Sequence, residues 1–557
     1  MSTSRFLSVS LLLLGTVSAE EKLSNFAPAP YRAGPWVLST RGEIWPKPQI
    51  QQSSSSFFSI NPDTFQFKLG PELIECEIVQ TALPRFFERV FPKFSTNSRT
   101  PKQELTNAID QEYLGGLDHV RVELVGTRAN CETHPYFGMI ESYNITIGGG
   151  DKNVITSESV WGLLKGLESF SQLVYSSSFP SQINETTIQD YPRFPHRGFM
   201  VDSSRHFLQM KMLKQTLDIL EMNKINVFHW HLVDDQSFPY QSMKFPNLSL
   251  LGAYQPYTHT YSPTDVEEII EFARLRGIRV IPEFDTPGHT QSWELGQPGV
   301  LTQCYTDDGH PDGSKGPMDP SNESLFDFLT DLFQELSAVF PDNYVHLGGD
   351  EVDTSCWESN PHITEFMAHL NITGEYRKLE SYHVERVLGI VDHLAKKSTP
   401  IVWEEVFDNG DNISKDTLVH VWKDGWQDTM KKATKAGFRV LLSSPFYLNR
   451  IAYGTDWVDM YKVEPLDFDG SANEEALVQG GEACIWGEWV DSVNLVTRAW
   501  PRGCAFAERF WSDSSVKDEA KAAPRLQEQE CRMLQRGYRV NPIVGPNFCP
   551  VDWDSIL

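Results

Sequence analysis

A repeating pattern of short apolar runs, each ending in polar or charged residues, extends from about residue 196 towards the end of the chain. Amphipathic stretches with helical spacing lie between several of these runs, at 208–223, 264–276 and 324–340. Short apolar runs of this kind are consistent with β-strands. The eight runs are 197–205, 225–235, 278–289, 344–352, 400–405, 418–423, 439–445 and 481–488.

Eight strands with helices between them predict an α/β fold, and within that class a (β/α)8 TIM barrel. A doubly wound sheet is the alternative, but it would place a glycine-rich phosphate turn after its first strand, and 197–205 contains none. In a barrel the carboxyl ends of all the strands meet in one pocket. The polar ends of the runs therefore predict a single pocket that gathers them.

The chain before the barrel has a different pattern. Apolar and polar residues alternate at 119–125 and 142–147, which predicts half-buried strands, and 157–175 has helical spacing. We expect a smaller α+β domain over 20–190 and the barrel catalytic domain over 191–557. The polar, proline-containing stretch 176–195 is the expected boundary between them.

The N-terminus has the features of a secretory signal peptide over residues 1–19. Arg5 precedes an apolar run at 6–14, and small residues at 17–19 form a cleavage site. No later run is long and apolar enough for a transmembrane helix, so we expect a lysosomal or secreted protein without membrane insertion. Glycosylation sequons begin at Asn144, Asn184, Asn247, Asn322, Asn371 and Asn412.

Composition narrows the class further. The formal net charge of −27 disfavours binding to nucleic acid or to an anionic membrane. The 15 tryptophans suit sugar binding as well as core packing. The eight cysteines are too widely spaced for a zinc knuckle and favour structural disulfides, with Cys531 and Cys549 close enough in sequence to pair. Cys484 lies in an apolar run and is expected to be a buried thiol.

The fourth run ends in Gly348-Gly349-Asp350-Glu351. Two glycines allow a sharp turn and a close approach to a ligand, and the acids then point into the pocket. The alternative is a helix N-terminus, where acidic residues are favoured by the helix dipole. Further polar or aromatic residues at the ends of the runs are Arg205, Asp234, Asp235, His289, Trp403, Glu404, Trp422, Tyr447, Trp486 and Glu488.

Three chemistries could use such a set. His229 and His231 share one face of a strand and raise the possibility of metal-assisted hydrolysis, but only His289 and His346 follow as further ligands. The second is glycoside hydrolysis by two carboxyl groups about 5 Å apart. The third is glycoside hydrolysis in which the 2-acetamido oxygen of the substrate attacks the anomeric carbon. Adjacent acidic residues suit the third scheme, because one turn positions both.

Several stretches resemble glycoside hydrolase family 20, and more narrowly the eukaryotic lysosomal-type β-N-acetylhexosaminidases. The resemblance covers nearly all of the chain after the signal peptide. The stretches are His196-Arg-Gly, Asp202-Ser-Ser-Arg-His, Asn226-Val-Phe-His-Trp-His-Leu-Val-Asp-Asp, Glu283-Phe-Asp-Thr-Pro-Gly-His, His346-Leu-Gly-Gly-Asp-Glu-Val, Trp403-Glu, Tyr447-Leu-Asn-Arg and Gly480-Gly-Glu-Ala-Cys-Ile-Trp-Gly-Glu.

This resemblance implies a role for each residue. Glu351 is the general acid and later the base, Asp350 accepts a hydrogen bond from the acetamido N–H, and Tyr447 donates one to the acetamido oxygen. Trp403, Trp422 and Trp486 surround the sugar, Arg205 and Glu488 bind hydroxyls at its non-reducing end, and Asp234 and His289 tune Glu351. The resemblance also implies a dimer, no cofactor and no metal, and cysteine pairs 76–131 (Cys76, Cys131), 304–356 (Cys304, Cys356) and 531–549, with Cys484 and Cys504 left over.

Asn449 and Arg450 resemble the corresponding pair of the α-type subunit, which accepts 6-sulfated N-acetylglucosamine. Arg450 would supply the cation for a sulfate, although an ion pair between Arg450 and another loop is the alternative. We expect an exo-acting, retaining hydrolase that releases terminal non-reducing β-linked N-acetylglucosamine or N-acetylgalactosamine by substrate assistance, through an oxazolinium intermediate. A retaining β-glycosidase with its own nucleophile and a non-catalytic sugar-binding barrel are the alternatives.

Overall fold

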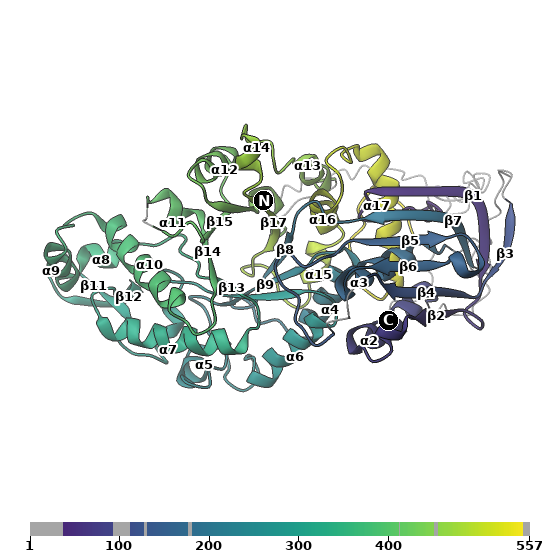
Figure 1. Ribbon diagram of the computed structural model, residues 1–557. Helices are drawn as coiled ribbons and strands as arrows, with labels where there is room; N and C mark the ends of the chain where they lie inside the picture. Colours follow the sequence, from purple (N-terminus) through teal and green to yellow (C-terminus); the bar gives the residue numbers. More distant parts are fainter. Residues whose placement is uncertain are drawn as a thin grey trace, which may run out of the picture.

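The structure is a computed structural model that describes residues 37–92, 112–126, 131–175, 181–410, 413–450 and 455–549. It contains a seven-stranded N-terminal sheet and a closed eight-stranded barrel, which lie side by side (Figure 1). The predicted signal peptide at 1–19 and the sequon at Asn412 lie outside the described residues.

The N-terminal sheet is mixed, with the strand order β2-β4-β6-β5-β7-β1-β3. Two helices, α2 and α3, accompany it. The predicted strands at 119–125 and 142–147 and the helix at 157–175 are present as β4, β5 and α3. The bounds are β1 Ile50–Ile60, β2 Gln66–Leu69, α2 Glu77–Val90, β3 Tyr113–Leu117, β4 His119–Leu124, β5 Tyr143–Ile147, β6 Val154–Ser157, α3 Val160–Leu173 and β7 Ser181–Asp190.

Part of the predicted boundary stretch 176–195 forms strand β7. Strand β7 pairs with both β5 and β1 and is therefore an inner strand of the sheet. Alternate residues of β7 face the core, but two of them, Thr186 and Asp190, are polar. The alternation of hydrophobicity that marks a strand is consequently weak here.

Helix α3 lies between the sheet and the barrel (Figure 1). Every residue of α3 is buried, and Trp511 from the barrel side belongs to the same apolar core. Buried ion pairs cross the interface, among them Arg89–Glu221 at 2.6 Å and Lys224–Asp190 at 2.9 Å. Because charges buried in this way must stay paired, the two domains form one continuous packed unit.

The eight barrel strands are hydrogen-bonded in the order β10-β13-β14-β15-β16-β17-β8-β9, with every pair parallel. Each of the eight predicted runs overlaps one strand of this barrel. The strands are β8 His196–Asp202, β9 Val227–Val233, β10 Arg279–Phe284, β13 Tyr344–His346, β14 Thr399–Trp403, β15 Leu418–Val421, β16 Arg439–Leu442 and β17 Val478–Ile485.

Helices cover the outside of the barrel, and the predicted amphipathic stretches correspond to α4, α6 and α7. A short antiparallel hairpin, β11–β12, lies in the connection between strand β10 and helix α7. The bounds are α4 Met210–Met222, α5 Asn247–Gly252, α6 Pro263–Arg274, β11 Leu301–Tyr305, β12 Pro311–Met318, α7 Glu323–Val339, α8 Ser355–Ser359, α9 Pro361–His369, α10 Tyr376–Asp392, α11 Glu404–Asp408, α12 Trp426–Lys435, α13 Trp457–Lys462, α14 Ala472–Glu475, α15 Leu495–Ala499, α16 Gly503–Trp511 and α17 Glu519–Gln535.

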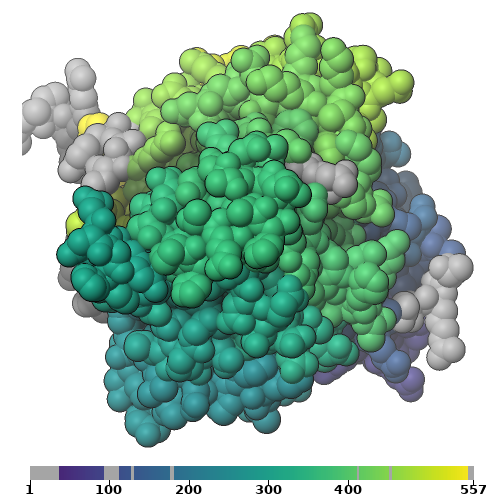
Figure 2. Space-filling view, turned by 90° about the vertical axis from the view of Figure 1, so that its left-hand side faces the viewer, coloured from purple at the N-terminus to yellow at the C-terminus, as the bar shows by residue number. Residues whose placement is uncertain are grey.

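The face of the molecule away from the N-terminal domain is made by segments coloured teal to green (Figure 2). Behind it, the blue and purple N-terminal domain is visible only at one edge. Within the part of the chain that the structure describes, no helix is both long and apolar enough to span a membrane.

Three disulfides join Cys76–Cys131, Cys304–Cys356 and Cys531–Cys549, which are the pairs that the family resemblance implies. Cys484 and Cys504 are buried and unbridged. Burial raises the pKa of both thiols well above the ordinary value, so these two cysteines are inert core residues.

His383 on α10 gives a prediction about stability at acid pH. Its ring is fully buried, and neither nitrogen has a hydrogen-bond partner among the described residues. Burial lowers the pKa of His383 from 6.5 to about 3. Between about pH 6.5 and pH 3, His383 therefore binds a proton in the unfolded chain but not in the folded chain. The free energy of unfolding consequently falls as the pH falls through this range.

We expect His383→Leu to gain about 2 kcal/mol relative to the wild type between pH 7 and pH 5. Denaturant unfolding of both proteins at the two pH values measures this difference. Any effect of the substitution on packing is the same at both pH values and therefore cancels. His369→Leu, which alters an exposed ring on α9, is the control and should show no such gain. A pH-independent effect of His383→Leu would contradict the expectation.

Candidate active site

The carboxyl ends of all eight barrel strands bring a polar or aromatic side chain to one end of the barrel. The candidate residues and the strands they follow are Arg205 (β8), Asp234 (β9), His289 (β10), Asp350 and Glu351 (β13), Trp403 (β14), Trp422 (β15), Tyr447, Asn449 and Arg450 (β16), and Trp486 and Glu488 (β17). The hydrogen bonds, ion pairs and ring contacts below connect most of them directly.

A glycine turn carries the adjacent acids out of the barrel. Strand β13 ends at His346, earlier than the run 344–352 suggested, because Gly348 and Gly349 have φ values of 68° and 95°. A Cβ on Gly348 would lie 1.7 Å from Asp285 Oδ1, and one on Gly349 would lie 2.6 Å from Val406 Cγ2. Only glycine fits both positions.

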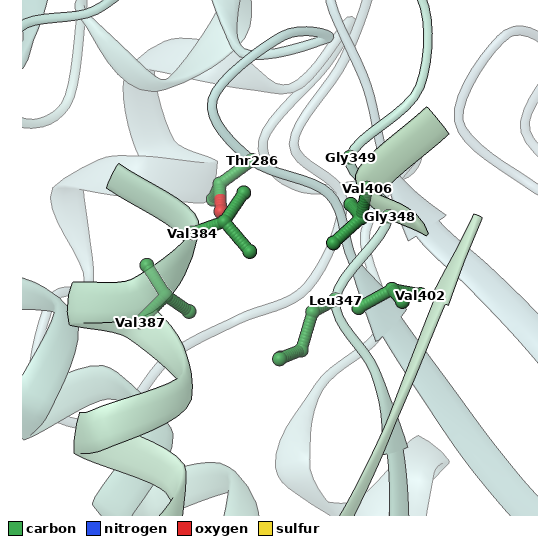
Figure 3. Close-up of a pocket in the computed structure, with 8 residues that line it drawn as sticks. All are labelled: Thr286, Leu347, Gly348, Gly349, Val384, Val387, Val402 and Val406. Carbon is green, nitrogen blue, oxygen red and sulfur yellow. The ribbon is translucent and has the colours of Figure 1, made fainter. Parts of the chain in front are cut away.

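Behind this turn is a small cavity of about 10 Å³, room for about one water molecule. Figure 3 shows Val384 and Val387 projecting from α10 towards the turn, with Leu347 opposite them. Apolar side chains thus support the turn from behind, while the Gly349 N–H donates a 2.8 Å hydrogen bond to Asp285.

Asp350 and Glu351 are neighbours in the chain with different surroundings. Asp350 is 6% exposed, and its Oδ1 is buried without a hydrogen-bond partner among the described residues. The Glu351 side chain is 61% exposed, on a residue with a φ of 50°. The imidazole of His289 faces both, with Nε2 at 3.8 Å from Asp350 Oδ2 and 3.9 Å from Glu351 Oε2. One acid is thus buried and the other is accessible.

Asp285 lies against Asp350 and is fully buried. Burial, reinforced by the negative charges of Asp350 and Glu283, raises the pKa of Asp285 well above its usual range. A neutral Asp285 reduces the repulsion between these two neighbouring acidic groups.

His289 connects the acids to the neighbouring strands. Its Nδ1 lies 3.2 Å from Asp234, which also binds Arg205 at 2.7 Å and His231 at 2.9 Å. Burial disfavours the charged ring, but the hydrogen bond to Asp234 and the charge of Asp350 outweigh it and raise the pKa of His289 to about 9. His289 is therefore an imidazolium ion at neutral and acid pH.

Aromatic rings form the walls of the site. The ring centroids of Trp403 and Trp486 are 6.0 Å apart, those of Trp403 and Trp422 6.5 Å, and Trp422 stacks on Tyr447 at 6.1 Å. Burial raises the pKa of Tyr447 well above its ordinary value, so its hydroxyl stays protonated and can donate a hydrogen bond. Arg205 lies over the ring of Trp486, 5.0 Å from its centroid.

Two predicted residues, Glu488 and Arg450, are exposed at the edge of this site. The guanidinium of Arg450 lies 5.4 Å from the centroid of the Tyr447 ring. Asn449 is half-buried, and its Oδ1 has no hydrogen-bond partner among the described residues. The positive charge of Arg450 is thus next to the aromatic wall of the site.

Sequence reasoning missed four carboxyl groups: Asp202, Glu283, Asp285 and Glu405. Asp202 accepts hydrogen bonds from Arg205 and from the Gly487 N–H, at 3.0 and 2.9 Å. Glu405 accepts a 2.9 Å bond from the Trp422 indole. Burial, with the charge of Asp350, raises the pKa of Glu405 to about 7. For Asp202 and Asp285, the position at the end of a strand was the signal that could have identified them.

His229 and His231 point into the barrel interior, where both nitrogens of each ring face carboxylates. Within the described residues, four groups of side chains have ligand atoms within 4.8 Å of one another and could approach a metal ion. These are His229, His346 and His420; His420, Glu482 and Cys484; Asp234, Asp235 and His289; and Asp285, His289 and Asp350.

Comparison with known families agrees with this geometry. A family model described as glycosyl hydrolase family 20, catalytic domain, matches residues 194–514, and one described as beta-acetyl hexosaminidase like matches residues 44–173. The chain belongs to glycosyl hydrolase family 20.

Relatives extend over most of the chain. The beta-hexosaminidase subunit alpha of Mus musculus is 46% identical over 520 residues, 92% of this chain and 96% of the relative. The beta-hexosaminidase subunit beta of Homo sapiens is 42% identical over 511 residues, 91% and 89% of the two chains. The chitobiase of Flavobacterium johnsoniae has a TM-score of 0.74 and 28% identity, covering 89% of this chain and 73% of that one. This family 20 protein is accordingly a glycoside hydrolase.

The glycine turn gives a prediction for this family 20 enzyme. Gly348→Ala must accommodate both a left-handed backbone and the clash with Asp285, so we expect most of the activity to be lost. Left-handed strain costs about 1–2 kcal/mol of stability, and the clash about 1–3 kcal/mol more. Gly299→Ala is the matched control, since Gly299 has a φ of 89° but an added Cβ would meet no atom within 4 Å. Equal losses of stability and activity in the two variants would contradict the role of the clash.

Proposed function

We propose that this chain is an exo-acting, retaining β-N-acetylhexosaminidase that releases terminal non-reducing β-linked N-acetylglucosamine or N-acetylgalactosamine by substrate-assisted catalysis. The observation that carries the proposal is the asymmetric acid pair. Asp350 is buried with one oxygen unpartnered, and Glu351 is exposed beside it. A buried carboxylate suits the alignment of an amide, and an accessible carboxyl group suits proton transfer.

In the first step, Glu351 protonates the glycosidic oxygen while the acetamido oxygen of the substrate attacks the anomeric carbon. The C–O bond to the leaving group breaks and an oxazolinium ion forms. Asp350 accepts a hydrogen bond from the acetamido N–H, and Tyr447 donates one to the acetamido oxygen. In the second step, Glu351 removes a proton from a water molecule as the water oxygen bonds to the anomeric carbon. The bond between this carbon and the acetamido oxygen breaks, so the oxazolinium ring opens with overall retention.

The surrounding residues support these roles. The rings of Trp403, Trp422 and Trp486 are close enough to enclose one sugar and exclude water from it. Arg205 and Glu488 supply a donor and an acceptor for the hydroxyls at the non-reducing end. The imidazolium of His289, near both acids, would stabilise Glu351 once it has given up its proton.

Removing the acid should have an effect that depends on the leaving group. In Glu351→Gln we expect kcat/KM to fall by about 10²–10⁴ for a disaccharide, whose leaving group needs a proton. For a dinitrophenyl glycoside, whose leaving group does not, the fall should be about tenfold or less. The two substrates are assayed side by side at the pH optimum of the wild type.

Glu358→Gln is the matched control, because Glu358 is another exposed glutamate, on the adjacent helix α8. It should retain wild-type values with both substrates. An equal loss with both leaving groups in Glu351→Gln would remove the assignment of Glu351 as the acid.

We further propose that Arg450 allows the enzyme to accept 6-sulfated N-acetylglucosamine. Its guanidinium is exposed beside Tyr447 and forms no salt bridge within the described residues, which favours a ligand over an ion pair with a loop. Arg450→Gln should lower kcat/KM for an aryl 6-sulfated glycoside by about 10–100-fold, the value of one charge-assisted hydrogen bond. The unsulfated glycoside is the internal control and should be unaffected; equal losses on both would contradict the proposal.

Localisation and assembly are also proposals. The signal-peptide pattern and the sequons favour a secreted or lysosomal glycoprotein; Asn144, Asn247 and Asn371 are exposed, whereas Asn184 and Asn322 are half-buried with hydrogen-bonded side chains. The mammalian relatives are named as subunits, and we propose that this chain also works as a dimer.

A further inference from the structure

Glu283, on strand β10 below the site, touches no sugar in the proposed mechanism but contacts residues that line the site. It is completely buried. Its Oε1 accepts a 2.9 Å hydrogen bond from the Trp403 indole, and its Oε2 lies 2.7 Å from His231 Nδ1 and 2.9 Å from His229 Nε2. A carboxylate buried so deeply is expensive unless each oxygen is hydrogen-bonded, and here both are.

The contact with Trp403 connects Glu283 to the wall of the site. An indole can only donate through Nε1, and an ionised carboxylate can only accept. The pair therefore has one compatible arrangement, which fixes the rotation of the Trp403 ring. That ring is fully buried and contacts both Trp422 and Trp486, so its orientation sets the position of the wall.

The contact with His231 connects Glu283 to the acid pair. His231 Nε2 lies 2.9 Å from Asp234 Oδ2, and Asp234 Oδ1 lies 3.2 Å from His289 Nδ1. His289 then faces Asp350 and Glu351 at 3.8 and 3.9 Å. The result is a continuous line of alternating carboxylates and imidazoles from the barrel interior to the catalytic pair.

The charges along this line are set by its geometry. His231 lies between Glu283 and Asp234, with Asp202 and the ring of Trp486 as further neighbours. Burial opposes protonation, but the surrounding carboxylates raise the pKa of His231 to about 10. A ring with a carboxylate at each nitrogen must carry both protons to satisfy both, so each member of the line holds the next one in place.

We propose that Glu283 is a positioning residue that holds Trp403 and, through His231 and Asp234, His289 in the arrangement that catalysis requires. The inference rests on the proposed roles of Glu351 and Asp350. A glutamine at position 283 has only one acceptor atom for the two donors, Trp403 Nε1 and His231 Nδ1, that hydrogen-bond to the carboxylate. It would release either Trp403 or His231.

The test compares Glu283→Gln with Glu482→Gln in the full-length enzyme. Glu482 is also a buried barrel glutamate with two histidine partners, His196 and His229, each at 2.7 Å, but it contacts neither Trp403 nor His231. We expect kcat to fall about tenfold to a hundredfold in Glu283→Gln and to change by less than about threefold in Glu482→Gln. In Glu283→Gln the line to His289 is loosened, so the His289 imidazolium is held less firmly beside Glu351 and stabilises its ionised form less. The basic limb of the pH–kcat profile should move to higher pH in this variant alone.

A double-mutant cycle with Asp234→Asn separates positioning from general destabilisation. If Glu283 acts through Asp234, the double variant should lose little more kcat than Asp234→Asn alone; independent effects would multiply. Trp403→Phe, which removes only the indole donor, tests the other connection should Glu283→Gln fail to fold. It should raise KM and leave the pH profile unchanged.

Equal losses in Glu283→Gln and Glu482→Gln, with multiplicative effects in the cycle, would overturn the inference. So would a Trp403→Phe variant with wild-type KM. Wild-type dependence on the acetamido group and on Glu351 would still stand in either case, so failure of this inference is distinguishable from failure of the proposed function.

Discussion

The 2.8 Å hydrogen bond from the Gly349 N–H to Asp285 fixes the point at which the two acids leave the barrel. It requires the backbone of Gly348 and Gly349 to lie directly against that carboxyl group, with left-handed φ values and no room for a side chain. Asp285 belongs to the loop after strand β10 and the glycines to the loop after β13, which are adjacent strands. The position of the chemistry therefore depends on one contact between neighbouring strand ends.

That contact places several acidic groups in a small volume, and the fold compensates for their mutual repulsion in two ways. Some of the groups are favoured in the neutral form, as burial and nearby charge raise the pKa of Asp285 and Glu405. Others are paired with cations: Asp234 lies against Arg205, His231 and His289. Because unpaired buried charges are strongly destabilising, the barrel interior must supply a cationic partner or a neutral form for each acidic group near the site.

The sequence predicted the barrel because its strands are buried on both faces, so that β8, β9 and β10 each contain an unbroken buried run. It did not predict β7, since half of the buried side chains in that strand, namely Thr186 and Asp190, are polar. Burial there is made possible by hydrogen bonds, for example from Tyr143 to Asp190, and no pattern of hydrophobicity reports them.

In the candidate site, too, some residues could be predicted from the sequence and others could not. Glu351, Asp350 and the tryptophans are at strand ends and could be found from the sequence together with the family resemblance. Glu405 and Glu283 could not, because their importance comes from contacts with residues of other strands, with Trp422 in one case and Trp403 in the other. Sequence order gives the ends of strands, whereas closure of the barrel decides which ends meet.

The central claim is that the substrate supplies the nucleophile, which Asp350 aligns. The most direct test compares kcat/KM of the wild-type enzyme for an aryl β-N-acetylglucosaminide and for the matching aryl β-glucoside, which lacks the acetamido group. Substrate assistance predicts that the first is hydrolysed at least about a thousandfold faster, as expected for a well-placed intramolecular nucleophile. Comparable values for the two substrates would show that the enzyme uses a nucleophile of its own and would contradict the account.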